Sequence, residues 1–450
     1  MQGDFSRDTF DPTRRFSRVL RQQGRVELEA DVNEQTSILL HYLRTLAADL
    51  MPMGAGSQED AFDVNFAGGK LTFMGGHYYV GGILCEAPLG ENTYEDQPDA
   101  WFMSDEDKAI DTDDPLLVYL DAWERHVDVN QDDRIREVAL GGPDTSSRAK
   151  VVWQVKTIPV PQAVPPTKDS VIAQWGDDLL PLLRPAKGRL IVKTGGSVPT
   201  QEECEVSPLA RYRGVENQLY RVEIHRSGRG SRDAKDGNPK VIGEATFKWS
   251  RDNGAITFAV RDAPSAAAKH DQVTLELASL GPDTQRSLAK GHRVELLNDS
   301  LVLGGMPGPV FRVESVNVSR REVNAVLETD GMPEGFTDDP DLHPILRRWD
   351  QRSADLALSE GKWLPLEAGI EIRFELDDDT FYQTGDYWLL PARTFDGRIE
   401  WPMTSDNPPK PIPQERRGVL HHYAPLAIIP AGGGPPISLR RKVPDLIPVP

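Results

Sequence analysis

Short segments in which apolar and polar residues alternate, separated by Gly and Pro, fill most of the chain. The runs QVTLELASL and VFRVESVNV are typical examples. Side chains alternate between the two faces of a β-strand, so this pattern predicts strands with one buried face. The 38 Gly and 36 Pro favour turns and oppose long helices. We therefore predict a mainly β chain of several small β-sandwich or β-barrel modules, with long loops and one N-terminal amphipathic helix.

The length of 450 residues exceeds what one hydrophobic core organises, which is about 100–200 residues. Several modules must therefore follow one another. We predict an attachment arm and helix over 1–54, a β-rich central domain with long loops over 55–265, a small β-barrel-like module over 266–335, a C-terminal β domain over 336–430, and a Pro/Gly-rich tail over 431–450.

Residues 1–30 form a charged arm that carries three spaced phenylalanines, Phe5, Phe10 and Phe16. An arm with so little apolar surface cannot bury itself, so we expect it to dock on another surface. The alternation in VELEA after Gly24 predicts a short strand.

A helix is predicted after the arm, because Asp31 and Glu34 have the spacing of a capping box, and Pro52 and Gly54 end the pattern. We expect the helix to pack on its own domain. The alternative is that it packs on copies of itself in an oligomer, because its apolar stripe has near-heptad spacing. The stripe consists of Val32, Leu39, Tyr42, Leu43, Leu46 and Leu50. The predicted assembly interface consists of Phe5, Phe10, Phe16, Leu39, Tyr42, Leu46 and Leu50.

Three Gly-Gly pairs follow the helix, and each fits the tight turn of a β-hairpin. The pairs occupy positions 68–69, 75–76 and 81–82. They predict three short strands over 70–74, 76–80 and 83–86.

One loop resembles the first half of a calcium-binding EF-hand, with Asp128, Asn130 and Asp132 at alternate positions. The match then fails, because Asp133 stands where the motif needs Gly and Ala139 where it needs Glu. We interpret the loop as turns and ion pairs and expect no cofactor. A calcium site is the alternative.

Candidate catalytic residues are few. Asp121 stands near the end of the strand LLVYLDAW and Glu124 directly follows it, where an acid–base pair could lie, and His421 and His422 precede YAPLA. Adjacent histidines point to opposite faces of an extended segment, which favours a structural role. The chain lacks the P-loop, G-x-S-x-G and H-E-x-x-H patterns. We predict no catalytic residue, no metal centre and no enzymatic activity.

Two segments, KWSRD and RRWD, place an indole beside a guanidinium and a carboxylate. Stacking and bidentate pairing predict that they fix loops to strands, and sugar binding is the alternative.

The formal net charge of −19 repels phosphate, so nucleic acid is an unsuitable partner. No apolar run approaches the roughly 20 residues of a membrane span, which predicts no membrane insertion. The first residues lack the apolar region of a signal peptide, so we expect synthesis in the cytoplasm. Cys85 and Cys204 lack disulfide or metal-site spacing and are expected to be reduced core residues.

Long motifs along nearly the whole chain resemble an uncharacterised bacterial domain family associated with phage-tail-like particles and extracellular contractile injection systems. The motifs are GDFSRDTFDPTRRFSRVLRQQGRVELEADVNEQ, HYYVGGILCE, VYLDAWERHV, REVALGGPDTSSRAKVVWQV, NQLYRVEIH, ATFKWSRDNGAI, LRRWDQ, TGDYWLLPAR and HHYAPLA. The opening segment is also similar to the attachment region of tail-fibre and baseplate proteins.

This resemblance implies a structural, baseplate- or tail-associated component of a contractile particle. It implies a homotrimer, because tail tips have three-fold symmetry, with other baseplate or tail proteins as partners. The protein would be assembled in the cytoplasm into a particle, and release by lysis is compatible with that. The alternative is a surface-glycan or cell-wall binding protein, or a weak glycan hydrolase, of such a particle.

Overall fold

The computed structural model describes residues 1–140, 144–160, 175, 183, 188–195, 211–230, 245–263, 272–329, 331–333, 336–352, 356–375 and 380–443. These residues form several β-sheets, a closed barrel and few helices, so the predicted mainly β fold is confirmed. The chain divides into two compact units. Unit 1 comprises Met1–Asp4, Asp128–Ser147 and Pro185–Val419, and unit 2 comprises Phe5–Val127, Arg148–Arg184 and Leu420–Pro450.

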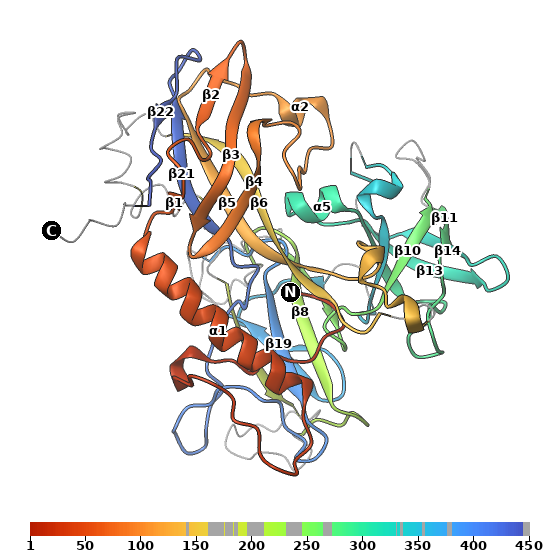
Figure 1. Cartoon of the computed structure of the whole chain (residues 1–450). Coiled ribbons are helices and arrows are strands. Elements are labelled where there is room, and N and C mark those ends of the chain that lie inside the picture. Colours follow the sequence, from red (N-terminus) through yellow and green to blue (C-terminus); the bar gives the residue numbers. More distant parts are fainter. Residues whose placement is uncertain are drawn as a thin grey trace, which may run out of the picture. The chain divides into compact units, whose positions relative to one another are not determined.

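Unit 2 contains two four-stranded sheets that share one core. The first has the order β22 (Ile437–Ser438), β21 (His422–Ile429), β5 (Leu116–Val127) and β6 (Arg148–Pro159). In the second, β3 (Lys70–Val80) pairs with β1 (Ala55–Gly56), β2 (Val64–Ala67) and β4 (Ile83–Thr93). Figure 1 shows β3 and β4 lying along β5, β6 and β21.

The core between these sheets is aromatic. Phe62 stacks on Phe73 at 5.7 Å and meets Trp153 edge-on at 5.2 Å. The run LLVYLDAW is buried at every position, because β5 is an inner strand covered on both faces. Cys85 lies in this core, and burial raises the pKa of its thiol well above the usual range. Cys204 lies outside the described residues.

The strand predictions around the second glycine pair were wrong. Residues 70–74 and 76–80 belong to one strand, β3, which has a bulge between Met74 and Gly76 instead of a turn. The reason is a close backbone approach, since a Cβ atom on Gly75 would lie 1.7 Å from the Pro88 carbonyl oxygen. The other two glycine pairs do connect neighbouring strands, β2 to β3 and β3 to β4.

The N-terminal helix of unit 2, α1, spans Glu29–Leu50. The helix begins two residues before Asp31, the predicted N-cap, so Asp31 lies in its first turn. The N-cap residue is Leu28, whose side chain cannot form a capping hydrogen bond. The predicted strand in VELEA is wrong, since the helix includes its last two residues and residues 26–28 belong to no strand. No helix among the described residues is both long enough and apolar enough to cross a membrane.

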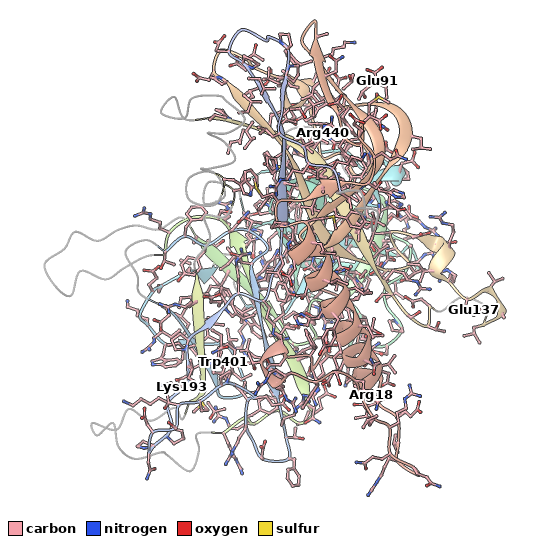
Figure 2. The ribbon with its side chains drawn as sticks, turned by 60° about the vertical axis from the view of Figure 1, so that its left-hand side comes forward. Arg18, Glu91, Glu137, Lys193, Trp401 and Arg440 are labelled. Atoms are coloured by element: carbon pink, nitrogen blue, oxygen red, sulfur yellow. The ribbon has the colours of Figure 1, made fainter. Side chains whose placement is uncertain are left out.

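The described part of the Pro/Gly-rich tail packs on unit 2. Leu439 is buried, and Arg440 donates to the carbonyl oxygens of Glu59 and Ala61 at 2.8 and 2.9 Å (labelled in Figure 2). The Val443 amide donates to Gly56 at 2.9 Å. The tail therefore fastens the end of its own unit as far as residue 443.

Unit 1 contains a closed six-stranded barrel and two four-stranded sheets. The barrel has the order β10 (Thr257–Asp262), β11 (Gln272–Leu277), β14 (Glu322–Leu327), β13 (Val310–Asn317), β12 (Arg293–Leu297) and β15 (Ile345–Trp349). Its strands start before and end after the segment 266–335 in which the sequence predicts a barrel-like module. The five predicted boundaries stay a prediction.

The two sheets of unit 1 enclose a second core. One has the order β16 (Leu356–Ala357), β9 (Thr246–Ser250), β8 (Gln218–Arg226) and β19 (Tyr387–Ala392). The other has the order β17 (Leu364–Pro365), β18 (Ile370–Phe374), β7 (Arg189–Thr194) and β20 (Gln414–Glu415). The short helices are α2 (Asp105–Lys108), α5 (Asp299–Gly304), η1 (Pro12–Arg14), η2 (Asp133–Ile135), η3 (Val138–Leu140) and η5 (Pro340–Leu342).

The segments KWSRD and RRWD meet in a buried ion cluster of unit 1. The Lys248 ammonium lies 2.7 Å from Glu295 and 3.1 Å from Glu223, and the Trp349 indole donates to Glu295 at 2.8 Å. Burial alone would raise the pKa of Glu295, but Lys248 and His225 hold it below its usual range. The cluster ties β9 to two barrel strands, in agreement with a structural role.

Candidate assembly interface

The polar side of α1 holds the helix to the N-terminal arm. The Asn33 amide donates to the Ser6 carbonyl at 3.0 Å, and the Ser37 hydroxyl donates to Asp8. Near the start of the helix, Gln35, which lies beside the apolar side rather than on the polar side, also accepts from the Val19 amide at 2.9 Å. Figure 1 shows the arm looping at the N-terminal end of α1. These bonds use the polar side chains that normally face solvent.

The same side of α1 also faces the β-structure of unit 2. Ile38 is fully buried, and Arg44 forms a two-pronged ion pair with Glu124 on β5, with N–O distances of 2.9 and 2.8 Å. A Cβ atom on Gly82 would lie 2.2 Å from the Arg44 carbonyl oxygen, so the helix backbone sits directly on the β3–β4 turn. The helix is thereby fixed in both position and rotation.

The apolar side of α1 points outward. Val32 is 47%, Leu39 55%, Leu43 64%, Leu46 60% and Leu50 69% exposed. Globular helices bury such a stripe and expose the polar face, so the polarity of α1 is inverted relative to its own body. Taking a half-exposed leucine out of water is worth roughly 1 kcal/mol, so this face gains several kcal/mol from any cover.

The outward side chains follow a heptad. With Thr36 included, the outward residues are spaced alternately by four and three positions. Val32, Leu39 and Leu46 then occupy d positions of the heptad, and Thr36, Leu43 and Leu50 occupy a positions. We call this line of six residues the α1 seam: Val32, Thr36, Leu39, Leu43, Leu46 and Leu50. A line with this period keeps one orientation along a partner helix.

The structure separates the seven predicted interface residues into two groups. Phe5 packs on His126 and Phe10 on His41, each with 5.3 Å between ring centres, so these rings anchor the arm within its own unit. The remaining five are about half exposed or more: Phe16, Leu39, Tyr42, Leu46 and Leu50. Whether they contact a partner stays a prediction.

The sequence reasoning omitted the apolar residues just before the helix. Leu20 is 71% and Val26 86% exposed, and Leu28 is also half exposed. They lie on a turn that an Arg21–Glu27 ion pair closes at 2.8 Å. Near this turn, Arg18 extends away from the ribbon (Figure 2). Val26 and Leu28 do carry a signal in the sequence, because they belong to the alternating pattern that predicts a short strand.

A groove of about 350 Å³ lies between the arm and the first turns of α1. Its lining residues come from both segments: Val19, Leu20, Arg21, Asp31, Val32, Gln35 and Thr36. Two of them belong to the α1 seam. The groove therefore adjoins the outward apolar line.

The EF-hand-like loop is built from turns and an ion pair. Asp128 accepts from the Asn130 amide at 2.8 Å, and Asn130 donates to Thr257 at 3.1 Å. Both carboxylate oxygens of Asp132 accept from Arg134, which lowers the pKa of this aspartate. Among the residues described, no three His, Cys, Asp or Glu side chains gather to hold a metal ion. The calcium alternative therefore gains no support from the geometry.

The candidate acid–base pair does not form. Asp121 and Glu124 are three residues apart on the regular strand β5, so they point to opposite faces. Asp121 is buried between Lys156 at 2.8 Å and His421 at 2.7 Å, and the Lys156 ammonium together with the His421 hydrogen bond holds the pKa of Asp121 low against the effect of burial. The contact between Asp121 and His421 was missed, because 300 residues separate them.

The indoles offer little to a glycan. Six of the nine are buried: Trp123, Trp153, Trp175, Trp249, Trp349 and Trp388. The cations of Lys193 and Arg373 lie over the Trp363 ring, 4.1 and 4.9 Å from its centre. The Lys156 ammonium lies over the Trp101 ring, 5.1 Å from its centre. Sugar stacking needs a free aromatic face, so this alternative has weak support.

The model of one protein family matches residues 1–171 and 186–434 of the chain. The chain belongs to the DUF6519 family. This is described as a family of unknown function. No curated protein and no solved structure matches the chain. The DUF6519 match includes the arm, α1 and parts of both compact units, so the inverted helix lies within the family region.

Proposed function

We propose that the protein is a non-enzymatic structural component of a phage-tail-like contractile particle, baseplate- or tail-associated, that assembles through its N-terminal segment as an oligomer. The observation that carries the proposal is the inverted polarity of α1, whose apolar seam faces solvent while its polar side holds the body. A soluble chain gains nothing from such a face unless another surface covers it.

The geometry suits an attachment element. The Arg44–Glu124 pair and the buried Ile38 fix the helix before any partner arrives, so little conformational entropy remains to be lost on docking. The residues that would act as catalysts are engaged in ion pairs within the fold. A rigid β body that carries a docking helix is what a particle component needs.

The resemblance of the opening segment to attachment regions of tail-fibre and baseplate proteins supports the particle assignment. Three-fold symmetry of tail tips favours a homotrimer, and other baseplate or tail proteins are the proposed neighbours. Cytoplasmic synthesis followed by incorporation into the particle is part of the same proposal.

The test is incorporation into particles sedimented from the producing cells. We expect the wild-type chain to co-sediment with sheath and tube proteins, and a Leu43→Glu/Leu46→Glu variant to stay in the soluble fraction. Leu89→Glu is the matched control, because Leu89 is 83% exposed on β4 of the same unit. Incorporation of the double variant at the wild-type level, or absence of the wild-type chain from particles, would overturn the proposal.

A further inference from the structure

We infer that the α1 seam is covered by the α1 helices of further copies of this chain, packed parallel and in register. This inference rests on the proposed function and adds the identity and orientation of the partner. Each seam residue would meet its own counterparts around a common axis.

The chemistry of the seam suits self-association. When helices pack parallel and in register around a common axis, each seam residue meets copies of itself, so a charged residue would face like charges. None of the six seam residues carries a charge, although 27% of the chain is charged. A seam built for a different protein has no such restriction.

The positions beside the seam are also nearly free of charge. In the heptad they are Asn33, Leu40 and Ala47 on one side and Gln35, Tyr42 and Asp49 on the other. Only Asp49 is ionised, so neighbouring copies do not repel each other along the helix. Leu40 and Tyr42 are 37% and 52% exposed and widen the apolar strip.

The order of the seam residues favours parallel packing. Leu39, Leu43, Leu46 and Leu50 follow one another toward the C-terminal end, and Val32 and Thr36 lie at the other end. In-register parallel helices form uninterrupted leucine layers, whereas antiparallel helices oppose these leucines to the smaller Val32 and Thr36. The Thr36 hydroxyl already donates to the Val32 carbonyl at 3.0 Å, so it enters an apolar layer without an unsatisfied donor.

The arm extends the same contact. Leu20 and Val32 line the groove between arm and helix, and Leu20, Val26 and Leu28 continue the apolar surface beyond the helix start. In the parallel packing the groove receives a side chain from the first turns of the neighbouring helix. A 22-residue helix is marginal as an isolated coiled coil, but here the body already holds it folded.

Disulfide mapping on the full chain tests the orientation. In a Cys204→Ser background, we expect Leu50→Cys to form inter-chain disulfides with itself under mild oxidation. Leu89→Cys is the control, because Leu89 is 83% exposed on the same unit and Leu50 is 69% exposed, and it should remain unlinked at the same concentration. A mixture of Val32→Cys and Leu50→Cys chains that links only 32 to 50 would overturn the parallel register.

Light scattering tests the partner. We expect the wild-type chain to be oligomeric at micromolar concentration and Leu43→Glu to weaken self-association by about 100-fold or more, because it buries unpaired carboxylates. A monomeric wild type whose Leu43→Glu/Leu46→Glu variant still fails to enter particles would overturn self-association, and with it the proposed homotrimer. It would leave intact the proposed role as a particle component that attaches through its N-terminal segment. If the wild-type chain forms oligomers as expected but the Leu43→Glu/Leu46→Glu variant enters particles at the wild-type level, the proposed function is overturned instead.

Discussion

Replacing Lys248 by Met removes the ammonium that pairs with Glu295 and Glu223 in the buried ion cluster of unit 1. Its side chain is 5% exposed and contacts both oxygens of Glu295, at 2.8 and 2.7 Å, as well as Glu223 at 3.1 Å. Met preserves most of the volume, so the change is mainly electrostatic. Breaking a buried ion pair from one side costs about 3–5 kcal/mol, and we expect Lys248→Met to lower the free energy of unfolding by that amount.

The value lies within this range because each carboxylate keeps other partners. Glu295 retains the Trp349 indole at 2.8 Å and the Gly308 amide at 3.1 Å, and Glu223 retains Arg221 at 2.5 Å. Arg221 still balances the charge of Glu223, which limits the loss, but the neutral indole and amide do not neutralise the buried charge of Glu295.

The pH dependence provides an independent sign. The pKa of Glu295 is held below its ordinary value of 4.5, so the contribution of this ion pair to stability is present above pH 4.5 and is lost as pH falls toward the lower folded pKa. Without Lys248, burial raises the pKa of Glu295. Protonation of Glu295 as pH falls then removes the unpaired buried charge and restores part of the variant's stability. We expect the stability gap between variant and wild type to be wider at pH 7 than at pH 4.5.

The assay is urea unfolding, monitored by amide hydrogen exchange in peptides of β8, β9, β12 and β15. These strands belong to unit 1, so the measurement reports the stability of unit 1 separately from that of unit 2. The matched control is Lys290→Met, because Lys290 is 74% exposed and pairs with Glu314 at 3.6 Å, a contact worth at most about 1 kcal/mol. A Lys248→Met loss no larger than that of the control, or a gap that does not narrow at pH 4.5, would refute the reasoning.

Three further predictions follow from unit 2 and the EF-hand-like loop. Ile38→Ala should lower the stability of unit 2 by about 2–4 kcal/mol, whereas Leu43→Ala should cost under about 0.5 kcal/mol in the dissociated chain; equal losses in urea unfolding would contradict the inverted polarity of α1. Gly75→Ala should prevent folding of the β3–β4 pair, because its Cβ would overlap the Pro88 carbonyl oxygen, and a soluble variant with wild-type circular dichroism would disprove this. Calcium at millimolar concentration should change the melting temperature by less than about 1 °C compared with chelator, and a clear rise that disappears in Asp128→Asn would restore the calcium alternative.

The alternation of apolar and polar residues was sufficient to predict a mainly β chain, because this alternation depends only on which face of a strand is buried. The sequence could not distinguish a turn from a bulge at Gly75 and Gly76, since a glycine pair allows both. The contact with the distant Pro88 decides for the bulge. The contact of Asp121 with His421 depends on strand pairing between β5 and β21, which no local pattern reveals. Pairing at long separation is the information that a single sequence lacks.

The apolar stripe of α1 was predicted residue by residue, yet the sequence could not say which side of the helix meets the body. An amphipathic pattern reports that one side must be covered, and the usual inference is that the body covers it. Here the arm and Glu124 cover the polar side instead, through residues that lie up to 80 positions from their partners. A single copy of the chain leaves the seam exposed to solvent, against the usual rule of apolar burial. A helix that is fixed by its polar face and left apolar toward solvent is therefore the physical reason for proposing that the chain acts through assembly.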